Sequence, residues 1–70
     1  MNLKKYLELS QTSYKTFSSL VGVTPMTVYR WVNGKRFPKY SELVRIEEVT
    51  GEAVTSRDFL ILYKTKEKNK

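Results

Sequence analysis

The chain has 70 residues and a formal net charge of +6 at pH 7, and it contains neither cysteine nor histidine. This length is enough for one small domain, and the missing residue types exclude disulfide bonds, thiolate or imidazole zinc sites, and Ser-His or Cys-His catalysis. No apolar run approaches the roughly 18 residues of a membrane span, and no signal peptide is recognisable, so the sequence predicts a cytoplasmic protein.

The first predicted helix begins after Asn2, a residue whose side chain can cap a helix. Its inner face carries three apolar residues at helical spacing, Leu3, Tyr6 and Leu7. The polar residues 10–13 follow and predict a turn. Within that turn, Thr12 or Ser13 can cap the second helix.

The second predicted helix covers residues 14–21 and ends at a glycine. Phe17, Leu20 and Val21 are three and four residues apart, which puts them on one face of a helix. Gly22 follows directly, and glycine readily adopts the left-handed backbone that a sharp turn after a helix requires. A tight turn is therefore predicted here.

The third predicted helix begins with Thr24 as its cap and Pro25 as its first residue, and it ends near Asn33. Its apolar face carries Val28, Trp31 and Val32. Gly34 then marks the predicted end of this helix. Two short helices that are joined by a glycine turn and share an apolar seam form a helix-turn-helix. This motif places its second helix in a DNA groove.

A basic turn at residues 35–38 separates the third helix from the fourth, because the residue before a proline disfavours helix. The fourth predicted helix covers about residues 40–50 and stops at Gly51. Its inward face carries Leu43, Ile46 and Val49. We expect the rings of Trp31 and Tyr40 to pack in the core rather than to stack on bases.

Residues 55–58 resemble a capping box with Asp58 in place of the usual Glu, and they predict a short fifth helix. Residues 59–63 are all apolar, so a strand is an alternative, but the preceding cap and the lack of another strand candidate favour helix. As a helix, this segment turns Phe59 and Leu62 to the core. The candidate dimer-interface residues are Leu60, Ile61 and Tyr63. Alternatively, the segment simply covers the first helix.

The whole chain is predicted to be all-α, a compact five-helix bundle. Residues 64–70 are charged and of low complexity, and they predict a disordered basic tail after a helix-turn-helix domain of residues 1–63. Residues 1–39 carry seven Lys or Arg and one acid, whereas residues 40–63 have a net charge of −3. A basic half that coincides with the helix-turn-helix indicates a polyanion as the partner.

The spacing Phe17-x-x-x-Val21-Gly22-Val23-Thr24-x-x-x-Val28-x-x-Trp31-x-x-Gly34 resembles the signature of the Cro/CI-type, lambda-repressor-like DNA-binding domains. The resemblance covers roughly residues 2–62. The chain's length and its ending also resemble small Cro-like phage regulators and YdaS-type antitoxin-like proteins. Two positions depart from the family pattern: Ser18 stands where most relatives have Ala, and Tyr14 stands where they often have Gln.

The resemblance implies a sequence-specific regulator of transcription that binds double-stranded DNA. In the first interpretation it is a Cro-type phage repressor that binds a palindromic operator as a weak homodimer in the cytoplasm of a bacterial host. In the second it is an antitoxin-like module whose apolar C-terminal segment also binds a toxin. Neither interpretation involves an enzyme activity, a metal, a cofactor, a membrane or a small-molecule substrate.

The resemblance also implies that Pro25, Met26 and Arg30 face the edges of the bases. Arg30 can donate two hydrogen bonds to guanine, and Met26 can contact a thymine methyl group. Thr27 can add a methyl group or a hydroxyl. Two alternatives remain: Arg30 binds a phosphate, and the Met26 thioether is simply exposed.

A second set of residues is expected to hold the DNA backbone. Asn33, Lys35 and Arg36 match phosphate-contacting positions of the family. Tyr14 and Lys15 open the second helix, whose N-terminus favours a phosphate. The remaining candidates for the backbone or for either role are Thr24 and Tyr29. Such contacts position a protein on DNA but carry no base information.

Overall fold

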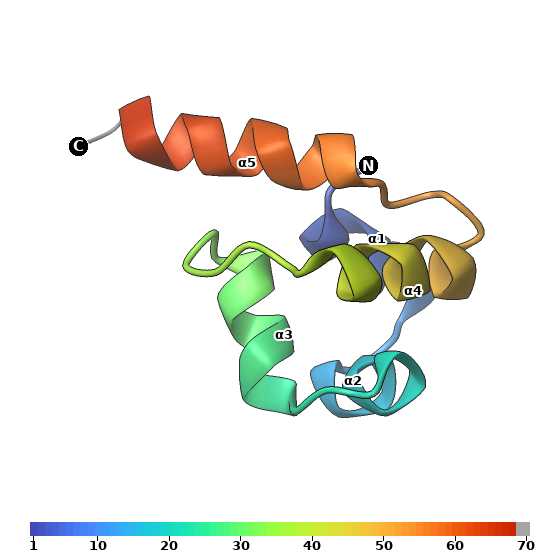
Figure 1. The fold of residues 1–70 in the computed structure, drawn as a ribbon. Helices are drawn as coiled ribbons and strands as arrows, with labels where there is room; N and C mark the ends of the chain where they lie inside the picture. The colour runs from blue at the N-terminus through green and yellow to red at the C-terminus, as the bar shows by residue number, and fades with distance from the viewer. Residues whose placement is uncertain (69–70) are drawn as a thin grey trace.

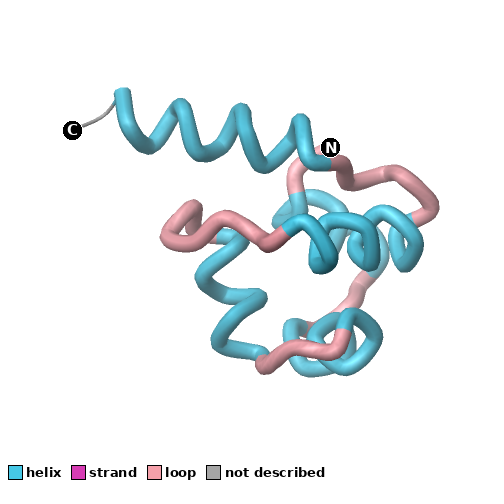
Figure 2. The backbone as a smooth tube through the Cα atoms, in the orientation of Figure 1, coloured by secondary structure: helices cyan, strands magenta, loops and turns pink. Residues whose placement is uncertain are grey.

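The computed structural model describes the backbone of residues 1–68 and the side chains of residues 1–62. Within that part the chain forms five helices and no strand: α1 Leu3–Ser10, α2 Tyr14–Val21, α3 Pro25–Val32, α4 Tyr40–Thr50 and α5 Ser56–Lys68. Short loops join them, and α5 lies across the molecule on the side opposite α2 (Figures 1 and 2). The prediction of an all-α, five-helix bundle is confirmed.

The first three helices begin at side-chain caps. The capping oxygens of Asn2, Ser13 and Thr24 accept backbone N–H groups three residues later, at 2.8, 3.1 and 3.2 Å. Each bond satisfies one of the N–H groups that a helix start leaves without a partner. The cap of α2 is therefore Ser13 rather than Thr12. At the start of α4, the Lys39 N–H donates to the Glu42 carboxylate at 2.7 Å.

Gly22 forms the turn between α2 and α3, as predicted. Its φ of +88° lies in the left-handed region, and its N–H donates to the Ser18 carbonyl at 2.8 Å. A Cβ built on Gly22 would meet no atom within 4 Å. The requirement for glycine is therefore set by backbone conformation and not by lack of space.

The core is apolar and draws on every helix. Its buried residues are Leu3, Leu7, Phe17, Val21, Val28, Trp31, Ile46, Val54 and Phe59. The Trp31 ring meets the Phe59 ring edge-on, with centroids 6.4 Å apart, and this contact ties α3 to α5. The prediction that Trp31 packs in the core is confirmed, since its side chain is fully buried.

Two residues that the sequence placed in the core are exposed. Leu20 is 48% exposed, because the buried side of α2 is formed by Phe17, Val21 and the small Ser18, whose hydroxyl donates to the Lys15 carbonyl. Ser18 takes the inward position that the spacing had given to Leu20. Tyr40 is 82% exposed, because it opens α4 on the outer side of that helix. Both predictions were wrong.

The start of α5 is fixed by Asp58. Its carboxylate accepts the Thr55 N–H at 2.9 Å and lies 3.2 Å from the Met1 ammonium, which also donates to the Ala53 carbonyl. Partial burial alone would raise the pKa of Asp58, but the Thr55 hydrogen bonds and the ammonium hold it below its ordinary value. Of the capping box predicted for residues 55–58, the bond from the Thr55 N–H to the Asp58 carboxylate is present, whereas the Asp58 N–H donates to the Thr55 carbonyl and not to its hydroxyl.

Residues 59–63 are helical, so the strand alternative is excluded. Phe59 is buried and Leu62 is half-buried, whereas Leu60 and Ile61 are 47% and 58% exposed. The side chain of Tyr63, the third candidate for a dimer interface, lies outside the described residues. The helix continues to Lys68, beyond the predicted boundary at residue 63, because no glycine or proline interrupts it and lysine and glutamate favour helix.

Candidate nucleic-acid interface

The helix-turn-helix is built by α2 and α3, which meet at Gly22. Figure 1 shows α3 running from the end of α2 towards the loop of residues 33–39. On α3, Val28 and Trp31 are fully buried against the core. The opposite side of α3 is therefore turned outward.

Four residues of α3 are exposed. They are Pro25, Met26, Tyr29 and Arg30, and we call them the reading face. Met26 and Tyr29 are 56% and 43% exposed. Tyr29 and Arg30 follow Met26 by three and four residues, so they flank it one turn further along the helix.

Thr27, the remaining base-contact candidate, is half-buried beside the helix cap. Its hydroxyl and that of Thr24 are 3.0 Å apart and form a hydrogen bond. The Thr24 hydroxyl also accepts the Thr27 N–H. These two residues therefore hold the start of α3, and their hydroxyls already have partners within the protein.

Tyr14 and Tyr29 bring the two helices of the motif together at the surface. Their rings meet edge-on with centroids 6.4 Å apart, in a geometry favourable to aromatic pairs. Both residues are candidate DNA contacts by sequence, but the contact between them was not predicted. Their separation in the sequence gives no helical spacing that would signal it.

The charge of the motif is one-sided. Between Glu8 and Glu42 the sequence has no acidic residue and five basic ones: Lys15, Arg30, Lys35, Arg36 and Lys39. All five side chains are exposed. A helix-turn-helix with exposed cations and no carboxylate of its own attracts a polyanion.

A family model described as helix-turn-helix matches residues 3–55. The chain belongs to the Cro/CI-type helix-turn-helix family. Its members are DNA-binding regulators of transcription, and this chain is one of them. No curated protein and no solved structure gives a significant match. Across the residues that the structure describes, no helix has the length and apolar character needed to cross a bilayer.

The residues predicted to contact the DNA backbone differ in exposure. Lys15, Lys35 and Arg36 are exposed cations at the start of α2 and in the loop after α3. Asn33 is half-buried, and its amide donates to the Tyr29 carbonyl at 2.8 Å. Asn33 therefore helps to end α3, and one N–H of its amide is already in use.

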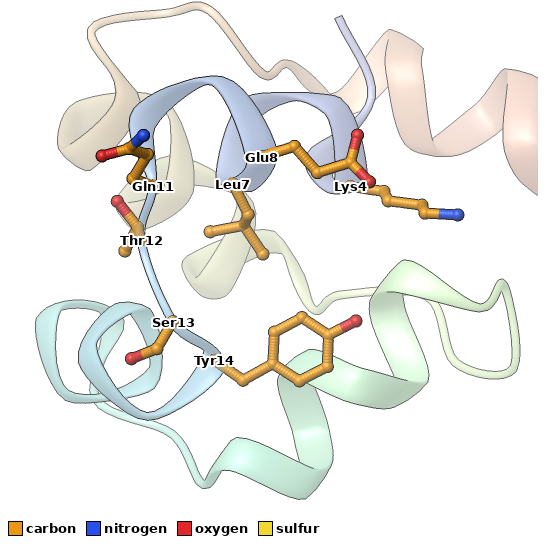
Figure 3. Close-up of a pocket in the computed structure, with 7 residues that line it drawn as sticks. All are labelled: Lys4, Leu7, Glu8, Gln11, Thr12, Ser13 and Tyr14. Atoms are coloured by element: carbon orange, nitrogen blue, oxygen red, sulfur yellow. The ribbon is translucent and has the colours of Figure 1, made fainter.

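A hollow of about 450 Å³ lies between α1 and the start of α2. Figure 3 shows its lining: Lys4, Leu7, Glu8, Gln11, Thr12, Ser13 and Tyr14. Lys4 lines this hollow with an exposed side chain. Glu8 lines the same hollow, so the two formal charges there cancel.

Proposed function

We propose that the protein is a Cro-type repressor that binds a palindromic operator in double-stranded DNA as a homodimer, in the cytoplasm of a bacterial host. The observation that carries this proposal is the reading face. Four side chains of α3 are exposed although the opposite side of this helix is fully buried. A helix held in this way can enter the major groove, which is about 12 Å wide.

Repression in this proposal is by occupancy and has no chemical step. The reading face contacts base edges, with Arg30 donating to guanine O6 and N7. Lys15, Lys35 and Arg36 neutralise phosphates on either side of the groove. The bound protein then excludes polymerase or a competing regulator from the same DNA.

Binding to duplex DNA is expected to weaken steeply with salt, because each neutralised phosphate releases counterions. With three phosphate contacts per protomer, the slope of log K against log salt is about −3 per protomer, at about −0.9 for each contact. Fluorescence anisotropy across a salt series measures this slope, with the single strand of the same sequence as control. A flat response, or tighter binding to the single strand, would contradict the proposal.

Two protomers are expected to bind a palindrome cooperatively through α5. Leu60 and Ile61 are about half exposed, and α5 begins where the family match ends. Truncation after Asp58 is a poor test because it also removes Phe59, which packs on Trp31. The double variant Leu60→Ser with Ile61→Ser leaves Phe59 in place. We expect this double variant to keep its affinity for a half-site and to lose cooperativity on the palindrome. Titration followed by native gel electrophoresis measures both properties. Unchanged cooperativity would show that the dimer contact lies elsewhere.

The same exposed side chains support a second candidate function, an antitoxin-like module that binds DNA and holds a toxin on α5. Both candidates use the same reading face. The gene neighbourhood distinguishes them: a divergently transcribed repressor gene supports the Cro-type proposal, and a downstream toxin gene supports the alternative.

A further inference from the structure

The reading face is predominantly apolar at its centre. Met26 is 56% exposed, and the exposed Pro25 and Tyr29 belong to the same face. Arg30 is the single charged residue in α3. A face of this composition has few groups that can form hydrogen bonds with the edges of bases.

Several polar groups close to this face are partly engaged within the protein. The Thr27 hydroxyl is paired with that of Thr24, and the Asn33 amide donates to the end of α3. The Tyr29 ring is in contact with the Tyr14 ring of α2. The Met26 thioether is at most a weak hydrogen-bond acceptor, so its contact with DNA is mainly apolar.

Base edges in the major groove offer one apolar group to such a side chain, the C5-methyl of thymine. We propose that α3 selects thymine through this methyl group, with Met26 as the central contact. This proposal rests on the proposed binding to duplex DNA.

Arg30 lies four residues after Met26, about 6 Å along the helix. The guanine that Arg30 reads is then about two base-pair steps from the thymine, since successive pairs are about 3.4 Å apart.

Replacing thymine by deoxyuridine tests the proposal, because it removes the methyl group and leaves base pairing intact. The preferred duplex is first selected from a random pool, and each thymine of one half-site is then replaced in turn. At the contacted thymine we expect binding to weaken about fourfold, the factor for one buried methyl-sized group. Anisotropy titration of the wild-type protein gives the affinity for each duplex.

Two variants assign the effect to Met26. Met26→Leu keeps an apolar side chain and should retain the preference for thymine over uracil. Met26→Gln has a similar length but a polar end, and it should bind both duplexes about equally. The side chain is largely exposed, so neither variant should change the melting temperature, which serves as the control for folding.

The possible outcomes separate this inference from the function on which it rests. Wild-type protein that binds its selected duplex but tolerates every uracil overturns the inference and leaves the proposed function intact. A uracil effect that persists undiminished in Met26→Gln also overturns it, since Met26 is then not the group that contacts the thymine methyl. Wild-type protein that prefers no duplex over random DNA contradicts the proposed function.

Discussion

Trp31→Ala is expected to lower the free energy of unfolding by about 3–5 kcal/mol, the cost of emptying a buried aromatic site. Trp31 is fully buried on α3, and its ring packs edge-on against Phe59 of α5. A domain of 70 residues has about 4–10 kcal/mol of stability in total. The variant should therefore be largely unfolded or melt at least about 12 °C lower, as thermal denaturation followed by circular dichroism would show.

Two further variants show whether the loss comes from burial. Trp31→Phe keeps most of the ring and removes the indole N–H, which is buried without a hydrogen-bond partner among the described residues. Losing an unsatisfied donor offsets part of the cavity cost, so this variant should be clearly more stable than Trp31→Ala. Tyr40→Ala, at a site 82% exposed, should change the stability by less than about 0.5 kcal/mol. Equal losses for Trp31→Ala and Tyr40→Ala would contradict the core described above.

Arg30→Ala is expected to weaken binding to the preferred duplex by about 1–3 kcal/mol and to relax specificity at one base pair of each half-site. Arg30 is exposed and projects from the reading face one turn after Met26. From there its guanidinium can donate two hydrogen bonds to guanine. Anisotropy titrations on the preferred duplex, and on duplexes altered at single positions, measure both effects.

Lys35→Ala is the matched control for a backbone contact. Lys35 lies beyond the end of α3, in the loop that follows Gly34, where the chain has left the face that reads bases. Its loss should weaken all sequences about equally and reduce the salt slope by about 1. If Arg30→Ala instead weakened preferred and random duplexes by the same factor, Arg30 would be a phosphate contact, and base reading would fall to Met26.

Local signals explain why so much of the helix-turn-helix could be predicted from the sequence. Asn2 and Thr24 cap helices through bonds to residues three positions later, and Gly22 adopts a positive φ; neither feature depends on distant parts of the chain. The burial of Val28 and Trp31 follows from their helical spacing. These positions fix where α3 lies and therefore which of its residues form the reading face.

The features that could not be predicted from the sequence depend on how the helices pack against one another. Helical spacing placed Leu20 on the inner face of α2, but the small Ser18 is buried there instead and Leu20 is exposed. The contact between Tyr14 and Tyr29 requires the crossing of α2 and α3, which no spacing encodes. The sequence likewise gave no sign that the Thr27 hydroxyl would be bonded to Thr24 rather than left for DNA.

Whether α3 reads base sequence in duplex DNA is tested by comparing affinities at one salt concentration. The dissociation constant of the wild-type protein is measured for the palindrome selected from a random pool and for random duplexes of the same length. We predict that the selected palindrome binds at least about 10³-fold more tightly, as sequence-specific proteins do. A ratio close to one would contradict the account, because the protein would then hold DNA through its phosphates alone.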